Sequence, residues 1–285
     1  KELTELAIVN EARKIAHKTG WTSDEKFEAI VDLYHSQVNL SHRTSQSILL
    51  QQYSTPAPIG YLAGLFCEID KLETKGGYAF EPSAGNGLLT IAGNPSRIYV
   101  NEIDDFRNLN LQTQGFANVW KRDATNEFFD VHRHFQAVMT NPPFGKINPK
   151  IAFNGFEFNT LDHVMALRAL ETMLEDGRAS IIIGGHTQWD ERGRIQAGKN
   201  RIFFNYLHHF YNVADVLQID GHKLYSRQGT SFNVRMILID GRKEIPQGAS
   251  PIYNEHNDKV IDTFDELYER VTSAMEQNHP IIMKP

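Results

Sequence analysis

Residues 135–144 have the sequence Phe-Gln-Ala-Val-Met-Thr-Asn-Pro-Pro-Phe, in which an apolar run passes directly into a turn with two prolines. The run 135–139 predicts a buried strand, because it is short, apolar and bounded by turn residues. The prolines make the turn rigid, since each has a fixed φ and no N–H to donate. We therefore expect the side chain of Asn141 and the carbonyl of Pro142 to accept hydrogen bonds from one amino group at the end of this strand. Phe144 adds a flat face on which an extruded base can stack.

Strand and helix patterns alternate on both sides of this run. Strands are predicted at 78–80, 97–100, 117–120, 179–183, 213–219 and 234–239. Helices are predicted at 56–69, after Gly87, up to about Gln114, at 161–174 and at 201–210. Alternation over roughly 170 residues indicates an α/β fold with a doubly wound, mostly parallel sheet that is covered on both faces. The last two strands have no full helix between them, so one of them is expected to run antiparallel.

Helical patterns flank this region. Two helices are predicted at 3–20 and 24–38, followed by a polar bridge at 41–52, and one more helix is predicted at 260–277. Thr55-Pro56 is the expected N-cap and first-turn proline of the helix that opens the α/β region. We divide the chain into an N-terminal helical segment (1–52), an α/β domain (53–245) and a C-terminal helical tail (246–285).

Composition limits the class of protein. Of the 285 residues 41% are hydrophobic, which is enough for a sizeable core, and no apolar run is long enough to span a membrane. The single cysteine, Cys67, excludes an internal disulfide and is typical of a cytoplasmic protein. No Cys/His group has zinc-ligand spacing, so no metal is expected. The chain begins with Lys1 rather than Met, which suggests a piece of a longer protein.

The net charge of −6 is unusual for a protein that binds nucleic acid through phosphates. Such contacts would have to come from local patches or from a module elsewhere. The loop 184–200 with Arg192, Arg194 and Lys199, followed by Arg201, is one candidate patch, and a solvated loop is the alternative. Lys146 and Lys150, shortly after the prolines, leave the same two interpretations open.

Acidic residues and a glycine turn follow the other predicted strands. The segment 81–87, Glu-Pro-Ser-Ala-Gly-Asn-Gly, comes directly after a strand, and its glycines allow a ligand to approach the backbone closely. Glu102 ends the next strand, 17 residues after Gly85, near the spacing at which a carboxylate binds ribose hydroxyls. Asp123 follows the third strand, and its carboxylate can accept a hydrogen bond from an adenine amino group. The simpler interpretations are that Glu102 is a solvated surface residue and that Asp123 caps a helix. The carboxyl ends of parallel strands share one edge of a sheet, so these residues and Asn141 are expected to converge there.

In this order the motifs resemble those of class I S-adenosylmethionine-dependent methyltransferases that methylate the N6 amino group of adenine in DNA. The catalytic motif of that family is Asn/Asp-Pro-Pro-Tyr/Phe. The segment Tyr53-Ser-Thr-Pro ahead of the glycine turn resembles the gamma arrangement, and the similarity covers roughly residues 50–240. The resemblance implies a Rossmann-like methyltransferase sheet with an N-terminal helical extension, S-adenosylmethionine as the cofactor, S-adenosylhomocysteine as its product and DNA as the substrate.

The resemblance also implies roles for individual residues. The catalytic set is Asn141, Pro142, Pro143 and Phe144. The cofactor-binding set is Tyr53, Thr55, Pro56, Glu81, Pro82, Ala84, Gly85, Gly87, Glu102, Ile103, Asp123, Ala124 and Asn141. The segment 231–235, Ser-Phe-Asn-Val-Arg, resembles one that lines the base pocket.

Two matters stay open at this point. DNA-modifying members of the family usually carry a target-recognition domain, and the residues after Gly241 are too few for one. The N-terminal helices, the rest of a longer chain or a separate subunit would have to take its place. Similar Asn-Pro-Pro-Tyr/Phe proteins act on guanine amino groups in RNA or on glutamine side chains of proteins. A non-catalytic nucleic-acid-binding module of a larger protein is the third alternative.

Overall fold

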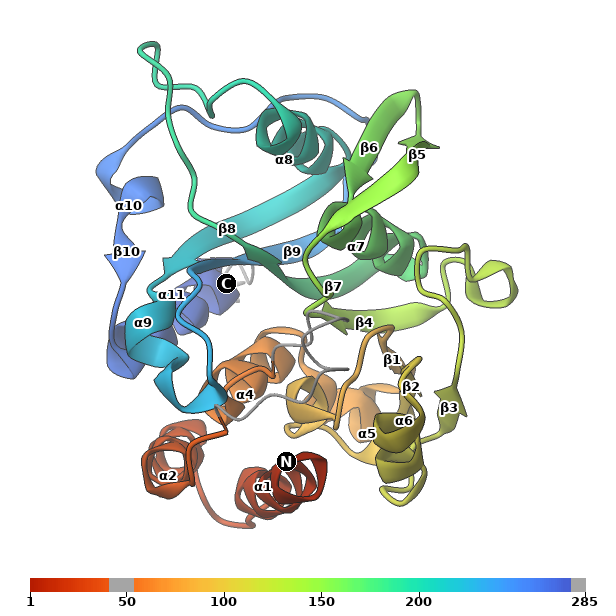
Figure 1. Ribbon diagram of the computed structural model, residues 1–285, viewed down its shortest axis with the longest axis vertical. Coiled ribbons are helices and arrows are strands. Elements are labelled where there is room, and N and C mark those ends of the chain that lie inside the picture. Colours follow the sequence, from red (N-terminus) through yellow and green to blue (C-terminus); the bar gives the residue numbers. More distant parts are fainter. Residues whose placement is uncertain (41–53, 278–285) are drawn as a thin grey trace, which may run out of the picture.

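A computed structural model of the chain describes residues 1–40 and 54–277. The predicted polar bridge and Tyr53 lie outside these residues. The main sheet has eight strands in the order β10-β8-β9-β7-β4-β1-β2-β3 (Figure 1). Their bounds are β1 (Ala79–Glu81), β2 (Ile98–Asn101), β3 (Asn118–Trp120), β4 (Phe135–Thr140), β7 (Met173–Gly184), β8 (Tyr211–Ile219), β9 (Val234–Arg242) and β10 (Val260–Ile261). The predicted α/β fold and its seven strands are confirmed, and β10 is an addition.

The sheet is mostly parallel. Strand β4 lies near its middle and pairs in parallel with β1 and β7, and β2 and β3 continue in parallel beyond β1. Strand β9 runs antiparallel to both of its neighbours, β7 and β8, which confirms the prediction for one of the last two strands. Every residue of β1 is buried, as expected for a short strand covered on both faces.

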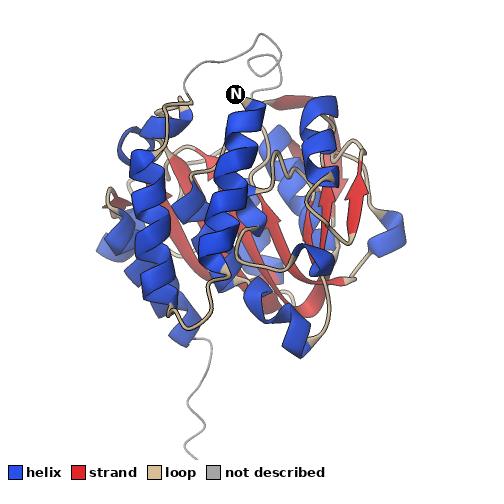
Figure 2. Cartoon of the chain, turned by 90° about the horizontal axis from the view of Figure 1, so that it is seen from below, coloured by secondary structure: helices blue, strands red, loops and turns tan. Residues whose placement is uncertain are grey.

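Helices cover both faces of the sheet (Figure 2). Their bounds are α1 (Glu2–Ala16), α2 (Ser23–Ser36), α4 (Ala57–Phe66), α5 (Leu72–Lys75), α6 (Asp105–Gln112), α7 (Leu161–Glu171), α8 (Lys199–Phe210), α9 (Gly221–Leu224), α10 (Glu255–Asp258) and α11 (Phe264–Gln277). One hydrophobic core joins α1, α2, α4 and α11 to one face, and a second joins α7 and α8 to the other. Hydrophobic contacts thus cross both predicted segment boundaries, and the division at 52 and 245 stays a prediction.

The start of α4 differs from its prediction. Its N-cap is Pro56 and its first turn contains Pro58, whereas Thr55 caps nothing. The hydroxyl of Thr55 instead accepts a hydrogen bond from Asn141, at 2.9 Å. The helix ends at Phe66 rather than at residue 69, because Glu68 has a left-handed backbone with φ 54°.

The predicted helix after Gly87 is wrong. Only a single 3₁₀ turn, Leu88–Thr90, follows the glycines, and Pro95 opens another short turn soon after. A proline in this position cannot continue a helix from the preceding turn. The short turn packs against α4 at Gly60, where a Cβ atom would collide with the carbonyl of Leu88. This close approach fixes the glycine turn against the helix beneath it.

A β-hairpin was missed between the prolines and α7. It consists of β5 (Lys146–Phe153) and β6 (Phe156–Thr160), which pair antiparallel. Its turn is Asn154-Gly155 with φ values of 48° and 83°, as the primed hairpin turns require. This Asn-Gly pair between apolar residues was the available signal. At the C-terminus, β10 replaces the start of the predicted helix, and α11 begins at Phe264.

Candidate active site

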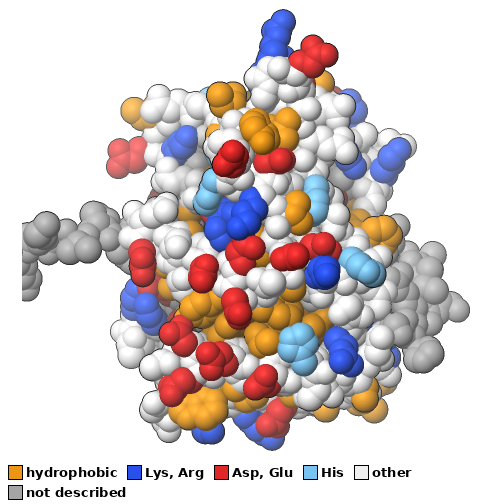
Figure 3. Space-filling view, turned by 90° about the vertical axis from the view of Figure 1, so that its left-hand side faces the viewer, with side chains coloured by type: hydrophobic (Ala, Val, Ile, Leu, Met, Phe, Trp, Pro, Cys, Tyr) orange, Lys and Arg blue, Asp and Glu red, His pale blue; other side chains and the backbone are white. Residues whose placement is uncertain are grey.

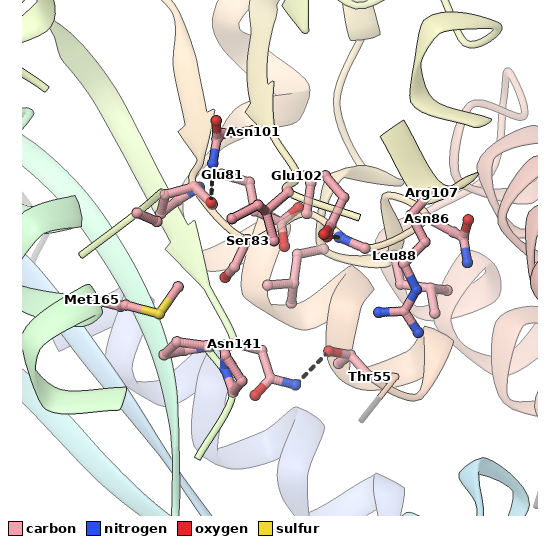
Figure 4. A pocket seen from close by; sticks show the side chains of 18 of the residues that line it. Thr55, Glu81, Ser83, Asn86, Leu88, Asn101, Glu102, Arg107, Asn141 and Met165 are labelled. Atoms are coloured by element: carbon pink, nitrogen blue, oxygen red, sulfur yellow. Dashed lines mark hydrogen bonds between the residues drawn. The ribbon is translucent and has the colours of Figure 1, made fainter. Parts of the chain in front are cut away.

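The carboxyl ends of β1, β2, β3 and β4 meet at one edge of the sheet and line a cavity. Glu81, Glu102, Asp123 and Asn141 contribute to it, one at or after the end of each strand. Figure 4 shows Glu81, Glu102 and Asn141 in this arrangement. Nine further residues of the sets given above also line it, namely Thr55, Pro82, Ala84, Gly85, Ile103, Ala124, Pro142, Pro143 and Phe144. Pro56 and Gly87 do not line it. The expected convergence is therefore present in the structure, whereas the roles of these residues stay predictions.

Glu102 holds the two turns that face it. One carboxylate oxygen accepts from the backbone N–H of Gly85 at 2.8 Å, and the other accepts from that of Asp104 at 2.9 Å. Only 6% of Glu102 is exposed, which excludes the reading as a solvated residue. Burial raises the pKa of its carboxyl, and the two N–H groups and the Arg107 guanidinium act against that rise. Glu102 thus fixes the glycine turn, where Gly85 has the left-handed φ of 56°.

Glu81 is a buried carboxyl without compensation. Only 2% of the residue is exposed, and its Oε2 has no hydrogen-bond partner among the described residues. Burial raises its pKa well above the ordinary value of 4.5, and the carboxylate of Glu102 raises it further. Such a group is stabilised in its charged form when a cation binds beside it. The glycine-turn side of the cavity is therefore suited to a positively charged ligand.

Asp123 caps a turn rather than a helix. Its Oδ1 accepts from the backbone N–H of Thr125 at 2.9 Å and from the hydroxyl of the same residue at 2.8 Å. No helix begins here, so the helix-capping alternative is wrong in its detail. The side chain is exposed at the mouth of the cavity, where its carboxylate can accept further hydrogen bonds.

The amide of Asn141 has a defined orientation. Its Nδ2 donates to the hydroxyl of Thr55 at 2.9 Å, as the dashed line in Figure 4 shows. Because the amide nitrogen is used in this way, Oδ1 is the atom left to accept a hydrogen bond from a ligand. Thr55 is itself buried, and its carbonyl accepts from Gln228 at 3.3 Å. The hydroxyl of Thr55 therefore orients the amide of Asn141 and does not cap helix α4.

Several lining residues were missed because they come from distant segments. Helix α1 contributes Glu5, whose carboxylate accepts from the hydroxyl of Ser54 at 2.5 Å. Glu2, in the same helix, accepts from Arg107 and from Asn86, each at 2.8 Å. Asn101 joins the ends of neighbouring strands through the carbonyl of Pro82, at 2.9 Å. Among these residues, only Asn101 could have been predicted from its position in the sequence, because it is the strand residue just before Glu102.

The geometry of the described residues can also be compared with that of metal sites and of membrane-spanning helices. Within 1–40 and 54–277, no group of His, Cys, Asp and Glu side chains is arranged to hold a metal ion. In the same part of the chain, no helix combines the length and the apolar character needed to cross a bilayer.

Solved structures identify the architecture. The chain aligns with a class I S-adenosylmethionine-dependent methyltransferase from Listeria monocytogenes at 10% identity and a TM-score of 0.57, covering 90% of this chain and 79% of that one. A modification subunit of a type I restriction enzyme from Vibrio vulnificus gives 10% identity and a TM-score of 0.56, with coverages of 93% and 60%. The M protein of EcoKI gives 12% identity and a TM-score of 0.51, with coverages of 94% and 71%. The chain has the class I methyltransferase fold.

The likeness is one of fold, since these identities are low. No protein-family model and no curated protein sequence matches the chain. The chain spans 60% of the length of the Vibrio subunit. The predicted Rossmann-like methyltransferase sheet is confirmed by these structures.

The donor set of the cavity fits the cofactor of the methyltransferase fold. S-adenosylmethionine carries an ammonium and a sulfonium group. The carboxyl of Glu81, whose Oε2 has no hydrogen-bond partner in the described part of the chain, matches a cation. Ribose hydroxyls match Glu102, whose oxygens accept one backbone hydrogen bond each and keep a second lone pair. The exposed carboxylate of Asp123 matches an adenine amino group.

Phe144 depends on the glycine opposite it. The ring lies against Gly184 at the end of β7, where an added Cβ would come within 3.2–3.3 Å of three ring carbons. Gly184→Ala is therefore expected to displace the ring and to lower kcat/KM by about tenfold, because small misplacements of a reacting group are costly. Cofactor affinity should change less than kcat/KM, since Gly184 itself does not line that cavity. Steady-state kinetics with calorimetry of cofactor binding measures both, and unchanged kinetics would show that the ring position is irrelevant.

Proposed function

We propose that this chain transfers a methyl group from S-adenosylmethionine to the exocyclic amino group of adenine in DNA. The observation that carries the proposal is the position of Asn141, Pro142 and Phe144 in one cavity with Glu81 and Glu102. The class I methyltransferase fold supports the reaction type. The type I modification subunits among the similar structures support a DNA substrate in a restriction-modification context.

In the proposed enzyme, Glu81 binds the ammonium group of the cofactor, directly or through water, and Glu102 binds the ribose. Asp123 accepts from the amino group of the cofactor's adenine, and Gly85 lets the ligand approach the backbone. When bound, S-adenosylmethionine supplies an electrophilic methyl group on a sulfonium, and S-adenosylhomocysteine is the product. The positive charge of the bound cofactor would then stabilise the ionised form of the buried carboxyl of Glu81.

In the same proposal, the substrate amino group lies beside the turn that follows β4. Asn141 Oδ1 and the carbonyl of Pro142 accept one hydrogen bond each from the two N–H bonds of this amino group. These hydrogen bonds direct the nitrogen lone pair towards the methyl donor. Phe144 stacks on the extruded base, an interaction worth roughly 1–3 kcal/mol. No strong base is needed, because the amino group releases its proton only after its nitrogen has gained the methyl group. Catalysis is thus mainly positioning and electrostatics.

Sequence recognition is proposed to lie outside this chain. A DNA enzyme of this kind needs a target-recognition module, and the modification subunits above belong to restriction systems of several components. A separate domain or subunit would supply it. The DNA substrate and the buried free thiol of Cys67 fit a cytoplasmic protein.

Cofactor affinity is expected to increase with pH and to be accompanied by proton release. Folding raises the pKa of the Glu81 carboxyl above 4.5, so the free protein keeps this proton where an ordinary Glu has lost it. A bound ammonium favours the ionised form and expels the proton. The same shift means that the stabilising contribution of protonated Glu81 is lost as the pH rises through its raised pKa.

Calorimetry in buffers of different ionisation enthalpy measures this proton release. Glu81→Gln should remove both the release and the pH dependence. Binding without proton release in the wild type would contradict the role of Glu81.

Transfer of a radiolabelled methyl group tests the proposed function. Duplex DNA, single-stranded DNA, RNA and a protein extract are offered in parallel, and the product is digested to identify the modified group. Label recovered as N6-methyladenine in DNA supports the proposal. Label only in RNA guanine or protein glutamine would replace the substrate and keep the site. Absence of cofactor binding would favour the non-catalytic module.

A further inference from the structure

Phe144 separates the cofactor-like cavity from a second cavity. The second cavity lies between the start of β5, the junction of β6 with α7, the end of β7, the N-terminus of α8 and strand β9. The residues that line it come from segments spread over 144–235, and the fold brings these segments together. Among the described residues, Phe144 alone lines both cavities. A base stacked on its ring would therefore have the second cavity beside it.

The second cavity is cationic, whereas the whole chain is acidic. Lys146, Lys199 and Arg235 line it together with a single carboxylate, Asp162. Burial raises the pKa of Asp162, and the charges of Lys199 and Arg235 act against that rise, whereas burial lowers the pKa of His163 to about 3, so this histidine is neutral. The chain carries a net charge of −6, and acidic side chains are scattered across the face shown in Figure 3. The lining of this cavity is thus opposite in sign to the net charge of the chain.

Three of the other basic candidates of the sequence have acidic partners. Arg194 and Arg201 both pair with Asp190, at 3.1 and 2.6 Å, and Lys150 pairs with Glu157 at 3.2 Å. No ion pair to Lys146 or Lys199 is found within residues 1–40 and 54–277. The two lysines of the cavity therefore keep their charge available for a ligand.

The N-terminus of α8 opens into the same cavity. Its N-cap is Gly198, so no side chain caps the first turn, and Lys199 and Asn200 at its start line the cavity. The first N–H groups of a helix have no partners within it and carry a partial positive charge. Together they form the usual binding geometry for a phosphate or another anion.

Arg235 gives independent evidence for an anion. It is 1% exposed, and its Nε and Nη1 have no hydrogen-bond partner among the described residues. Its Nη2 donates to the carbonyl of Gly184 at 2.7 Å and lies 3.5 Å from Asn200 Oδ1. A buried guanidinium with unpaired nitrogens is costly unless an anion compensates it. Asp162 compensates it in part, since its charge favours the protonated Arg235.

We infer that the second cavity binds a phosphate of the substrate strand beside the nucleotide whose base stacks on Phe144. Lys146 and Lys199 neutralise the phosphate, and the N–H groups of the first turn of α8 donate hydrogen bonds to its oxygens. The buried guanidinium of Arg235 adds positive charge at the wall of the cavity. This inference rests on the proposed function, because it requires a nucleic-acid substrate. It gives an acidic protein a local cationic site for the substrate backbone, directly beside the base-stacking ring.

The test compares DNA binding of three variants with that of the wild type. The probes are a fluorescent adenine-containing single strand and its duplex, titrated over a range of salt. Lys146→Gln/Lys199→Gln should weaken binding at low salt about tenfold and reduce the slope of log K against log salt by about 0.7–0.9 for each phosphate that is no longer neutralised. Lys150→Gln, on the same strand but outside the cavity, is the matched control and should bind like the wild type.

Asn200→Asp separates binding from folding. A carboxylate in the first turn favours the helix, so thermal stability should not fall. The same carboxylate lies next to Arg235 and occupies the place of the anion, so DNA binding should weaken. Cofactor affinity, measured by calorimetry, should be unchanged in every variant.

Two results would overturn the inference. If the wild type binds and methylates DNA and the double variant and Asn200→Asp keep its affinity and salt slope, the phosphate site is wrong and the proposed function stands. If the wild type binds S-adenosylmethionine but neither DNA probe even at the lowest salt, the phosphate site is wrong, and the methyl-transfer assay decides separately on the DNA substrate.

Discussion

Asn141→Ala should abolish methyl transfer while cofactor binding survives. The substitution removes the side-chain oxygen that accepts from the target amino group, and only the carbonyl of Pro142 then remains to orient it. Loss of one preorganised hydrogen-bonding group in an active site typically lowers kcat by about 10²–10³-fold. Asn141 follows β4, the strand next to β1, but the contacts proposed for Glu81, Glu102 and Asp123 do not use its side chain, so the cofactor should keep its main contacts. Single-turnover transfer of labelled methyl groups measures the first effect and calorimetry the second.

Two further variants make this result specific. Asn126→Ala removes an exposed asparagine that does not line the cavity, and it should behave like the wild type. Thr55→Val removes the hydroxyl that holds Asn141 Nδ2, so it should lower turnover less than Asn141→Ala does. Turnover at the wild-type rate in Asn141→Ala would refute the proposed mechanism. Joint loss of cofactor binding would instead make Asn141 a cofactor residue.

The part of the site that sequence could predict follows from the order of the strands. Parallel strands expose their carboxyl ends at one edge, so Glu81, Glu102, Asp123 and Asn141 were expected together from their places after successive strands. The convergence needs no knowledge of side-chain contacts. The positions of the buried strands could also be predicted from the sequence, since each is a short apolar run between turn residues.

The rest depended on contacts between distant segments. The capping role expected for Thr55 was wrong because its hydroxyl pairs with Asn141, 86 positions away. Glu5 reaches the cavity from a helix whose own pattern shows only an amphipathic face. The second cavity joins Lys146 to Arg235 through a hairpin that was not foreseen. Local patterns carry no information on such pairs.

The two cavities differ in the charge of the side chains that line them. The first is lined by buried carboxyls, suited to a cationic cofactor, and the second by cationic groups, suited to a phosphate. Phe144 stands between them, and Gly184 leaves room for its ring. An acidic protein can in this way bind both a cation and a polyanion without a broad basic surface.

Glu102→Ala is expected to weaken cofactor binding by about 100-fold. The carboxylate accepts from the N–H groups of Gly85 and Asp104, and both would lose a charged partner inside the protein. A hydrogen bond to a charged group contributes about 1.5–3 kcal/mol, and 1.4 kcal/mol corresponds to a tenfold change in Kd. The substitution removes the proposed ribose acceptor and releases the glycine turn, so both effects lower affinity. Calorimetry with S-adenosylmethionine and S-adenosylhomocysteine measures the change.

Glu102→Gln distinguishes loss of the ligand contact from loss of the turn. The amide keeps one acceptor oxygen and adds no charge, so Kd should rise by less than in Glu102→Ala. Folding raises the pKa of the Glu102 carboxyl, so its ionisation costs stability as the pH rises above 4.5, and glutamine removes this cost. Glu28→Ala, an exposed glutamate of α2, is the matched control. An unchanged Kd in Glu102→Ala would exclude Glu102 from the cofactor site, because no neighbouring described group replaces both of its hydrogen bonds.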